Sequence, residues 1–311
     1  MIASRPAFSV ATPTRNALDK LKRCSGSVRG QGAVALEHLV QDAQSTDGTV
    51  EWLHTQAEQH THLHPVSEPD GGMYDAINRA WARAGGRYLS WLNSDEQYLP
   101  GALAQVQACF EANPEVDVVS GDFLVTDAHG RAIALRREIP LRRFYVATTH
   151  LNTMTCTLFY RRELWDRGLL TLDSQYRYAA DKDLVLRLLT AGVRFRHLPV
   201  VLSVFGVDGT NLSTHPGMAE EAERIRLANG AFRWRPLRAL AFGARRAERL
   251  VRGCYRAVDL QYRYALDEVP RYAVFQSKRL GARYALSDIQ GSAELLGDTA
   301  PAVQGNFERP L

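Results

Sequence analysis

The sequence predicts an α/β fold with a mostly parallel central sheet. Short apolar runs alternate with helical patterns along the first two thirds of the chain, and three of these runs are followed by acidic residues. Such alternation is typical of parallel sheets, because a helix usually connects two parallel strands. Ligands of open α/β sheets bind beyond the carboxyl ends of the strands, which is where Asp42, Asp70 and Asp95 are expected.

Local sequence patterns predict where the first strands and helices lie. Residues 8–12 form an apolar run that a proline ends, which predicts a strand, and a helical pattern begins at about Ala17. Residues 36–40 predict a second strand before a polar turn. Residues 49–59 follow that turn with a helical pattern. The first half of the domain therefore begins as strand, helix, strand and helix.

The next elements continue this order. Residues 61–66 predict a short strand, and residues 74–84 a helix that two glycines end. Residues 87–92 are apolar enough for a buried strand. Residues 100–112 predict a helix that starts at a proline, and residues 116–120 predict a further strand.

Composition excludes several classes of protein. Of the 311 residues, 45% are hydrophobic and 23% are charged, which excludes a disordered, collagen-like or coiled-coil chain. A net charge of +4 is too small to indicate a nucleic-acid partner. No secretion signal and no apolar run of about 18 residues is found. The four cysteines, which have no metal-binding spacing, indicate reduced thiols. We therefore expect a cytoplasmic protein.

A polar turn after the buried strand at 87–92 predicts a metal site. It reads Asn93, Ser94, Asp95 and Glu96. Two adjacent carboxylates repel each other unless a cation lies between them, and Mg²⁺ or Mn²⁺ binds through one or two carboxylates plus substrate phosphates. The turn is therefore a candidate metal–diphosphate site, and a solvated turn that ends a strand is the alternative.

Four motifs follow one another along the first third of the chain, namely SVATPTRN at 9–16, DAQSTDGT at 42–49, SEPDGGMYDAIN at 67–78 and AGGRYLSWLNSD at 84–95. Together they resemble glycosyltransferase family 2, in the style of bacterial enzymes that build surface polysaccharides. The likeness extends over about residues 8–213. It implies the GT-A fold, a central sheet flanked by helices, in which a nucleotide- and metal-binding half precedes an acceptor half.

The resemblance implies roles for residues near the nucleotide. Asp42 would accept the imide N–H of a uracil-like base, for which an ionised carboxylate is suited because it only accepts hydrogen bonds. A helix-capping role is its alternative. Asp70 would lie against the nucleotide, and Thr12 and Pro13 would line the base pocket. Arg15 replaces the aromatic residue that the family usually has there.

The resemblance also assigns the metal site. Asp95 and Glu96 would hold a divalent cation, Mn²⁺ or Mg²⁺, while Asn93 and Ser94 would contact the nucleotide. Glu96 stands where the family has a second aspartate, so its oxygens are displaced by about one carbon–carbon bond. We expect a working site in which Asp95 ligates the ion directly.

A third motif supplies the candidate base. The segment YRYAADKDLVLR at 176–187 resembles the family segment whose first aspartate is the general base, which corresponds to Asp181. Inverting sugar transfer needs a carboxylate that removes the proton of the acceptor hydroxyl as that oxygen attacks the anomeric carbon. Asp183 would point elsewhere, because positions two apart do not share a helix face. A helix-dipole partner is the alternative role for Asp181.

The resemblance predicts an inverting, metal-dependent glycosyltransferase. Its donor would be a nucleotide-diphosphate sugar, with a UDP-sugar favoured, and its acceptor a saccharide or lipid-linked saccharide. The catalytic domain would span 1–216, with a nucleotide half at 8–122 and an acceptor half at 123–216. A sugar nucleotidyltransferase and a non-catalytic nucleotide-sugar-binding relative are the alternatives.

Residues 217–311 predict an arginine-rich helical extension. Eleven arginines and two acidic residues lie between Arg224 and Arg263. Apolar residues recur there at steps of three and four, namely Leu240, Ala244, Ala247, Val251, Cys254, Val258 and Tyr262. The stretch 224–263 either lies on an anionic membrane, at the cytoplasmic face of the inner membrane, or docks on the catalytic domain. Nucleic acid is the third alternative and is not expected, because no aromatic stacking platform accompanies the arginines.

Overall fold

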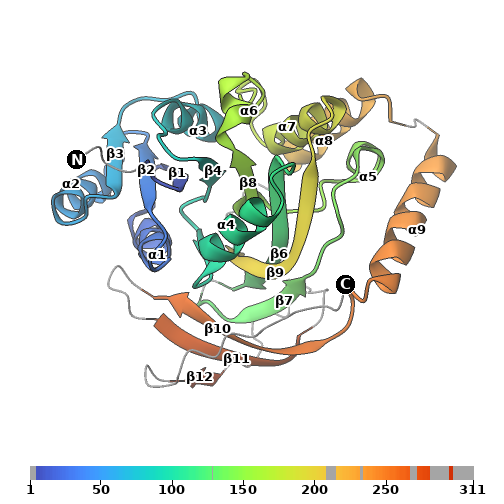
Figure 1. Ribbon diagram of the computed structural model, residues 1–311. Coiled ribbons are helices and arrows are strands. Elements are labelled where there is room, and N and C mark those ends of the chain that lie inside the picture. The colour runs from blue at the N-terminus through green and yellow to red at the C-terminus, as the bar shows by residue number, and fades with distance from the viewer. Residues whose placement is uncertain are drawn as a thin grey trace.

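In the computed structural model, residues 5–127, 129–207, 215–231, 234–266, 272–280 and 294–296 are described. Figure 1 shows a large curved sheet flanked by helices, with a smaller sheet below it. The large sheet has the strand order β3 (Leu63–Ser67), β2 (Leu36–Asp42), β1 (Phe8–Thr14), β4 (Tyr88–Trp91), β8 (Leu158–Arg161), β6 (Val118–Thr126), β9 (Phe195–Gly206) and β5 (Glu96–Tyr98), and β7 (Ala132–Arg136) pairs with β6. The predicted α/β fold is confirmed.

The first four strands of the sheet are parallel, as the sequence predicts. Strand β1 lies between β2 and β4, and β3 pairs with β2, all in parallel register. The other half of the sheet is mixed, because β8, β5 and β7 run antiparallel to their neighbours while β6 and β9 are parallel. The parallel half therefore forms a single edge at which four strand ends meet.

Helices cover both faces of the sheet. The helices predicted in the first part of the chain are present as α1 (Leu18–Arg29), α2 (Thr49–Gln59), α3 (Met73–Ala82) and α4 (Ala102–Ala112). The second part adds α5 (Arg143–Thr148), a short 3₁₀ helix (Thr155–Thr157), α6 (Arg162–Asp166), α7 (Ala180–Thr190), α8 (Pro216–Ala228) and α9 (Arg235–Val251). In the described part of the chain, no helix is long and apolar enough to cross a bilayer.

Alternating side chains of β1 build a core on each face of the sheet. Phe8 and Val10 lie in the core that also contains Cys24 of α1, whereas Ala11 lies in the core that contains Trp81 of α3. This alternation is the period-two pattern of a strand that is buried on both faces. All four cysteines are buried and free, which agrees with the expected reduced thiols.

Gly86 fits a position where β1 and the turn before β4 come very close. A Cβ atom added to Gly86 would lie 2.6 Å from the backbone nitrogen of Ser9 and 2.7 Å from the carbonyl carbon of Phe8. Backbone atoms in the sheet centre have little room to move, so Gly86→Ala is expected to destabilise the protein by about 3 kcal/mol or more. Thermal or urea unfolding measures this loss.

The neighbouring glycine provides the matched control for that prediction. At Gly85 the nearest atom to an added Cβ is a carboxylate oxygen of Glu37, at 3.4 Å, which is ordinary van der Waals contact. Gly85→Ala is therefore expected to change the free energy of unfolding by less than about 1 kcal/mol. Equal stability of the two variants would contradict the close approach at Gly86.

The C-terminal extension is helical only in part, so the prediction of a helical extension is wrong beyond α9. Gly253 adopts the left-handed conformation (φ +67°) just after α9, which ends the helix. The chain then forms a three-stranded antiparallel sheet of β10 (Val258–Ala265), β11 (Tyr272–Leu280) and β12 (Glu294–Leu296). Leu260, Tyr262 and Tyr264 are buried at every second position, which is strand periodicity.

The small sheet packs on the large one. Leu260 and Phe275 share a core with Leu124 of β6 and Val204 of β9. Gln97 of β5 joins the two sheets through its side-chain amide, which donates to the Ala265 carbonyl at 3.0 Å and accepts from the Ala265 N–H at 2.9 Å. The extension is therefore docked on the large sheet beside β5.

Candidate active site

The strand ends of the parallel half bring the predicted acidic segments to one edge. In the register of the sheet, Thr14 lies beside Asp42, and Asp42 lies beside Ser67, each at or near the end of its strand. Leu92, which follows β4, donates its N–H to the Ala11 carbonyl at 2.9 Å, so the segment from residue 93 emerges next to the end of β1. The segments that follow β2, β3 and β4 therefore start from the same edge.

Asp42 is fully buried at the end of β2. One carboxylate oxygen accepts the Ser45 hydroxyl at 2.5 Å, and the other accepts the Ser45 N–H at 3.0 Å and the Ser67 hydroxyl at 2.6 Å. A carboxylate has about four lone-pair sites, so three donors of the chain leave capacity for one more. These bonds fix the carboxylate between the loops that follow β2 and β3.

The three residues expected around the base are oriented differently. Thr12 is buried on the α1 side of β1, where its hydroxyl lies 2.8 Å from Nε2 of His38. Pro13 is buried within β1 opposite Gln41. Arg15, just beyond the strand, is exposed. Of the three, only Arg15 extends its side chain outward from this edge.

Asp70 lies after β3, half-buried. Its carboxylate accepts the Gly72 N–H at 2.9 Å. Burial raises the pKa of Asp70, the Gly72 N–H opposes that rise, and so do the charges of Arg79 and Arg15. The charge of Asp75 adds to the rise, and Arg15, which follows β1, is near enough to Asp70 for its charge to lower the pKa slightly.

The segment after β4 has one acid turned inward and one on a surface hollow. Glu96 is buried, and its carboxylate accepts the Asn93 N–H at 2.8 Å. Burial, and then the charge of Asp95, raise the pKa of Glu96 to about 8. Asp95 and Ser94 are half-buried. Glu96 is thus held in the fold, while Asp95 is the more accessible of the two carboxylates.

The hollow beside Asp95 contains residues that the sequence analysis did not single out. Lys20 and Arg23 line it from α1, Asp127 from the end of β6, and Tyr264 from β10. Lys20 and Arg23 are three positions apart on a helix, a spacing that places them on one face, so this pair could have been found from the sequence. Tyr264 could not, because it reaches the hollow only through the docking of the small sheet.

The residues fit a divalent cation that is shared with a diphosphate. Among the described residues, no three His, Cys, Asp or Glu side chains form a metal cage. Such a cage is not required, because Mg²⁺ usually binds through one or two carboxylates plus substrate phosphates. Among the described residues, Oδ1 of Asn93 and Oε1 of Glu96 are buried without a hydrogen-bond partner, although the Cys156 thiol and the Asn93 side chain lie near the Glu96 carboxylate. Unpaired oxygens beside Asp95 are the donor set that a hard cation prefers.

Asp181 lies in the first turn of α7 and faces α3. The Tyr74 hydroxyl, from the first turn of α3, is within hydrogen-bonding reach of the Asp181 carboxylate. Burial raises the pKa of Asp181 to about 6, although backbone N–H groups, the charge of Lys182 and the Tyr74 hydroxyl all favour the ionised form. Helix α3 begins just after β3 and Asp70, so Tyr74 links Asp181 to the edge that carries the other acids.

Two further contacts hold the segment before Asp181 in place. The carboxylate of Glu221, on α8, accepts the N–H groups of Arg177, Tyr178 and Ala179 at 2.8, 2.7 and 3.0 Å. The amide of Asn78, on α3, forms two hydrogen bonds with the backbone of Leu172 at 2.8 and 2.9 Å. Glu221 gave no signal in the sequence, because its partners lie more than forty positions away.

Comparison with known proteins agrees with this fold and sequence pattern. Residues 9–168, just over half of the chain, match the family described as Glycosyl transferase family 2. A PGL/p-HBAD biosynthesis glycosyltransferase of Mycobacterium bovis is 28% identical over 212 residues, which cover 66% of this chain and 78% of that protein. An uncharacterized glycosyltransferase of Mycobacterium tuberculosis is 32% identical over 197 residues, or 60% of this chain and 70% of its own length.

Solved structures share the fold. The structure of S. aureus TarS 1-349 in complex with UDP-GlcNAc matches with a TM-score of 0.58 and 19% identity, over 72% of this chain and 66% of that chain, just under two thirds of its length. A mannosyltransferase from Pyrobaculum calidifontis in complex with GDP-Man and Mn²⁺ matches with a TM-score of 0.50 and 20% identity, over 81% and 83% of the two chains. The fold is therefore GT-A, and the sequence match shows that the chain belongs to glycosyltransferase family 2.

Proposed function

We propose that the protein is an inverting glycosyltransferase that moves a sugar from a nucleotide-diphosphate donor to a hydroxyl of a saccharide or lipid-linked saccharide. The observation that carries this proposal is the carboxylate of Asp181, which Tyr74 links to the strand edge bearing Asp42, Asp70 and Asp95. The proposal includes a catalytic domain at 1–216 with its nucleotide half first. The mycobacterial relative named for PGL/p-HBAD biosynthesis is a glycosyltransferase, which supports the sugar-transfer reaction.

Different residues of the chain have separate roles in binding the donor. Asp42 uses its remaining acceptor capacity for the imide N–H of the base, and Asp70 and Arg15 flank the nucleotide. Lys20 and Arg23, beside Asp95, are placed to counter the charge of a diphosphate. Donors found with relatives of this fold are UDP-GlcNAc and GDP-Man, and the predicted role of Asp42 favours a UDP-sugar here.

Asp181 performs the proton transfer in this proposal. Its ionised carboxylate takes the proton of the acceptor hydroxyl. The hydroxyl oxygen then bonds to the anomeric carbon from the face opposite the diphosphate. At the same time the bond between that carbon and the diphosphate oxygen breaks. The sugar leaves as a glycoside of inverted configuration, and the nucleoside diphosphate leaves with the electron pair. A divalent cation held by Asp95, with Glu96 and Asn93 behind it, would supply Lewis-acid stabilisation of the departing diphosphate.

The test is a panel of nucleotide sugars assayed for release of nucleoside diphosphate. Release that requires an acceptor saccharide and Mn²⁺ or Mg²⁺, and that stops with EDTA, is the expected result. A nucleotidyltransferase would instead release pyrophosphate from a nucleoside triphosphate and a sugar phosphate. Calorimetric binding of a nucleotide sugar without any turnover across the panel would contradict the proposal and favour a non-catalytic relative.

The raised pKa of Asp181 predicts a pH dependence. Only the ionised carboxylate accepts a proton, and burial raises its pKa to about 6. We expect kcat/KM to be constant above about pH 7 and to fall about tenfold per pH unit well below pH 6. A pH profile measured with saturating cation checks this. A profile that stays flat down to pH 5 would contradict a base with a raised pKa.

A further inference from the structure

Helix α9 docks on the catalytic domain through arginines rather than through its apolar face. Arg245 and Arg249 are buried, and their guanidinium groups lie 3.7 and 3.3 Å from the carboxylate of Glu138, which is 2% exposed. Burial raises the pKa of Glu138, and the charges of Arg249, Arg136 and Arg245 oppose that rise. Arg245 also lies 2.7 Å from a ring nitrogen of His150. The inner face of α9 therefore carries these arginines, beside buried Ala241 and half-buried Phe242.

The apolar face of α9 points outward as a consequence. Leu240 is 69% exposed, Leu250 is 67% exposed and Val251 is 87% exposed. Ala244 and Ala247 are also exposed, and they lie on the same side of the helix between Leu240 and Leu250. Trp234, at the N-cap, is 65% exposed. The outer stripe is therefore defined as Trp234, Leu240, Ala244, Ala247, Leu250 and Val251.

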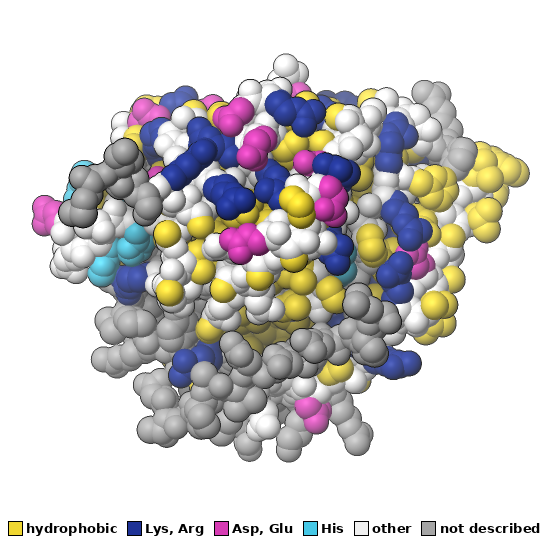
Figure 2. All heavy atoms as spheres, in the orientation of Figure 1, with side chains coloured by type: hydrophobic (Ala, Val, Ile, Leu, Met, Phe, Trp, Pro, Cys, Tyr) yellow, Lys and Arg dark blue, Asp and Glu magenta, His cyan; other side chains and the backbone are white. Residues whose placement is uncertain are grey.

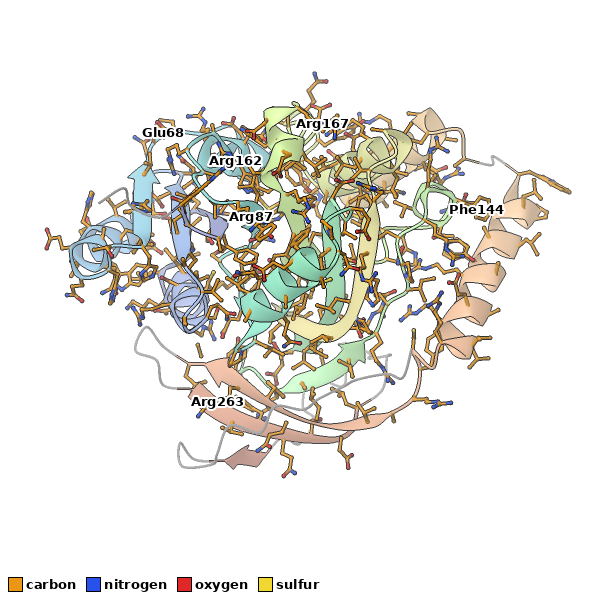
Figure 3. All side chains as sticks on the ribbon, in the orientation of Figure 1. Glu68, Arg87, Phe144, Arg162, Arg167 and Arg263 are labelled. Atoms are coloured by element: carbon orange, nitrogen blue, oxygen red, sulfur yellow. The ribbon has the colours of Figure 1, made fainter. Side chains whose placement is uncertain are left out.

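Other exposed apolar side chains lie on the neighbouring elements. Phe144 of α5 is 49% exposed, and Figure 3 shows it on the side of α5 toward α9. Leu227 of α8 is 38% exposed. Among the large hydrophobic residues that the structure describes as exposed, only Leu266 lies outside α5, α8 and the outer stripe. Figure 2 shows hydrophobic side chains along the outer edge formed by α9, with Lys and Arg side chains beside them. Concentrated exposed apolar area of this kind marks an interaction surface.

We propose that the outer stripe of α9 binds the surface of an anionic lipid bilayer, with the helix axis parallel to the membrane plane. At about 100° per residue, Arg246 lies on one flank of the stripe, next to Leu250 around the helix. Arg246 is exposed. A helix with an apolar stripe and a basic residue at its edge can lie in the membrane interface, its apolar side chains among the acyl chains and its cation at the headgroups.

Charge favours a bilayer over a second copy of the chain. Helix α9 contains five arginines and one acidic residue, so two outer stripes packed face to face would bring helices of like net charge together, and like charges repel. Glu248, the one acidic residue of α9, already contacts Arg142 at 2.8 Å and Arg252 at 3.0 Å. Anionic headgroups provide the opposite charge that a second copy lacks. The proposal does not depend on the glycosyl-transfer activity.

The test measures partitioning of the full-length chain onto vesicles by co-sedimentation. The protein is expected to bind phosphatidylcholine vesicles that contain phosphatidylglycerol, and to bind pure phosphatidylcholine vesicles much more weakly. The double variant Leu240→Gln/Leu250→Gln removes two exposed apolar side chains without emptying the core, so it should keep the wild-type melting temperature. It is expected to lower partitioning onto the anionic vesicles by about a hundredfold, or about tenfold per leucine.

Leu266→Gln is the matched control, because Leu266 is 45% exposed but lies beyond β10, away from the stripe. It should bind vesicles as the wild type does. Arg246→Gln should weaken binding to anionic vesicles and reduce its salt dependence. Failure of the wild type to bind anionic vesicles would overturn the proposal, and so would equal binding by a folded double variant. A wild-type dimer in sedimentation velocity that the double variant loses, without any vesicle binding, would instead assign the stripe to a second copy.

Discussion

Asp181→Asn is expected to lower the rate of sugar transfer by about 10²- to 10⁴-fold while donor binding stays nearly unchanged. An amide has the size of the carboxylate but cannot take the proton of the acceptor hydroxyl, and proton transfer by a positioned group contributes roughly this factor. The Tyr74 hydroxyl can still donate to the amide oxygen, so the turn should keep its geometry. Initial rates of nucleoside diphosphate release, together with calorimetry of the nucleotide, measure both quantities.

Asp183→Asn is the control for that experiment, two residues along the same helix. The Asp183 carboxylate, whose side chain is 15% exposed, pairs with Arg187 one turn away at 2.7 Å. Such pairs contribute about 0.5 kcal/mol, so Asp183→Asn should leave both stability and transfer close to wild type. If Asp181→Asn transfers sugar as fast as the wild type, Asp181 is not the base.

Asp95→Asn is expected to remove the cation dependence of donor binding and to lower transfer by about 10²- to 10³-fold. The accessible carboxylate of the segment after β4 is lost, and the amide that replaces it carries no charge to hold a divalent ion. Lewis-acid stabilisation of a leaving diphosphate is worth several kcal/mol, and each 1.4 kcal/mol corresponds to about tenfold in rate. Calorimetry of UDP and GDP with Mn²⁺ and with EDTA gives the binding part of this prediction.

The wild type should bind the nucleoside diphosphate more tightly with Mn²⁺ than with EDTA, and Asp95→Asn should show no difference. Asp166→Asn is a suitable control, because this α6 carboxylate is 56% exposed and pairs with Arg162 at 3.5 Å on the helix surface. If Asp95→Asn retains the Mn²⁺ dependence of the wild type, the cation is held elsewhere.

Much of the fold could be predicted because its signals are local. The parallel half alternates apolar strands with helices, and each polar loop follows its strand directly, so Asp42, Asp70 and Asp95 could be placed at one edge from the topology of parallel sheets. The end of α9 could not be predicted in this way. Val258 and Tyr262 satisfy a helical spacing and a strand alternation together, and only the sheet they join decides between them.

The burial and orientation of individual side chains also could not be predicted from the sequence. Thr12 and Arg15 are three residues apart, yet one side chain faces the α1 core and the other is exposed, because the strand ends between them. Glu96 follows Asp95 directly but turns inward onto the Asn93 N–H. Neither difference follows from residue type, since each depends on the neighbours that the fold brings to that position.

The sequence by itself determined the family, the parallel edge and the identity of the candidate acids, because these depend on residue order and on periodicity over a few residues. Only the tertiary structure decided how the acids are supported, through Tyr74, Glu221 and Asn78, whose partners are distant along the chain. It also decided which face of α9 is buried. The sequence shows an amphipathic helix, but buried Glu138 draws the arginines of α9 inward and leaves its leucines exposed, since a buried carboxylate requires cationic partners.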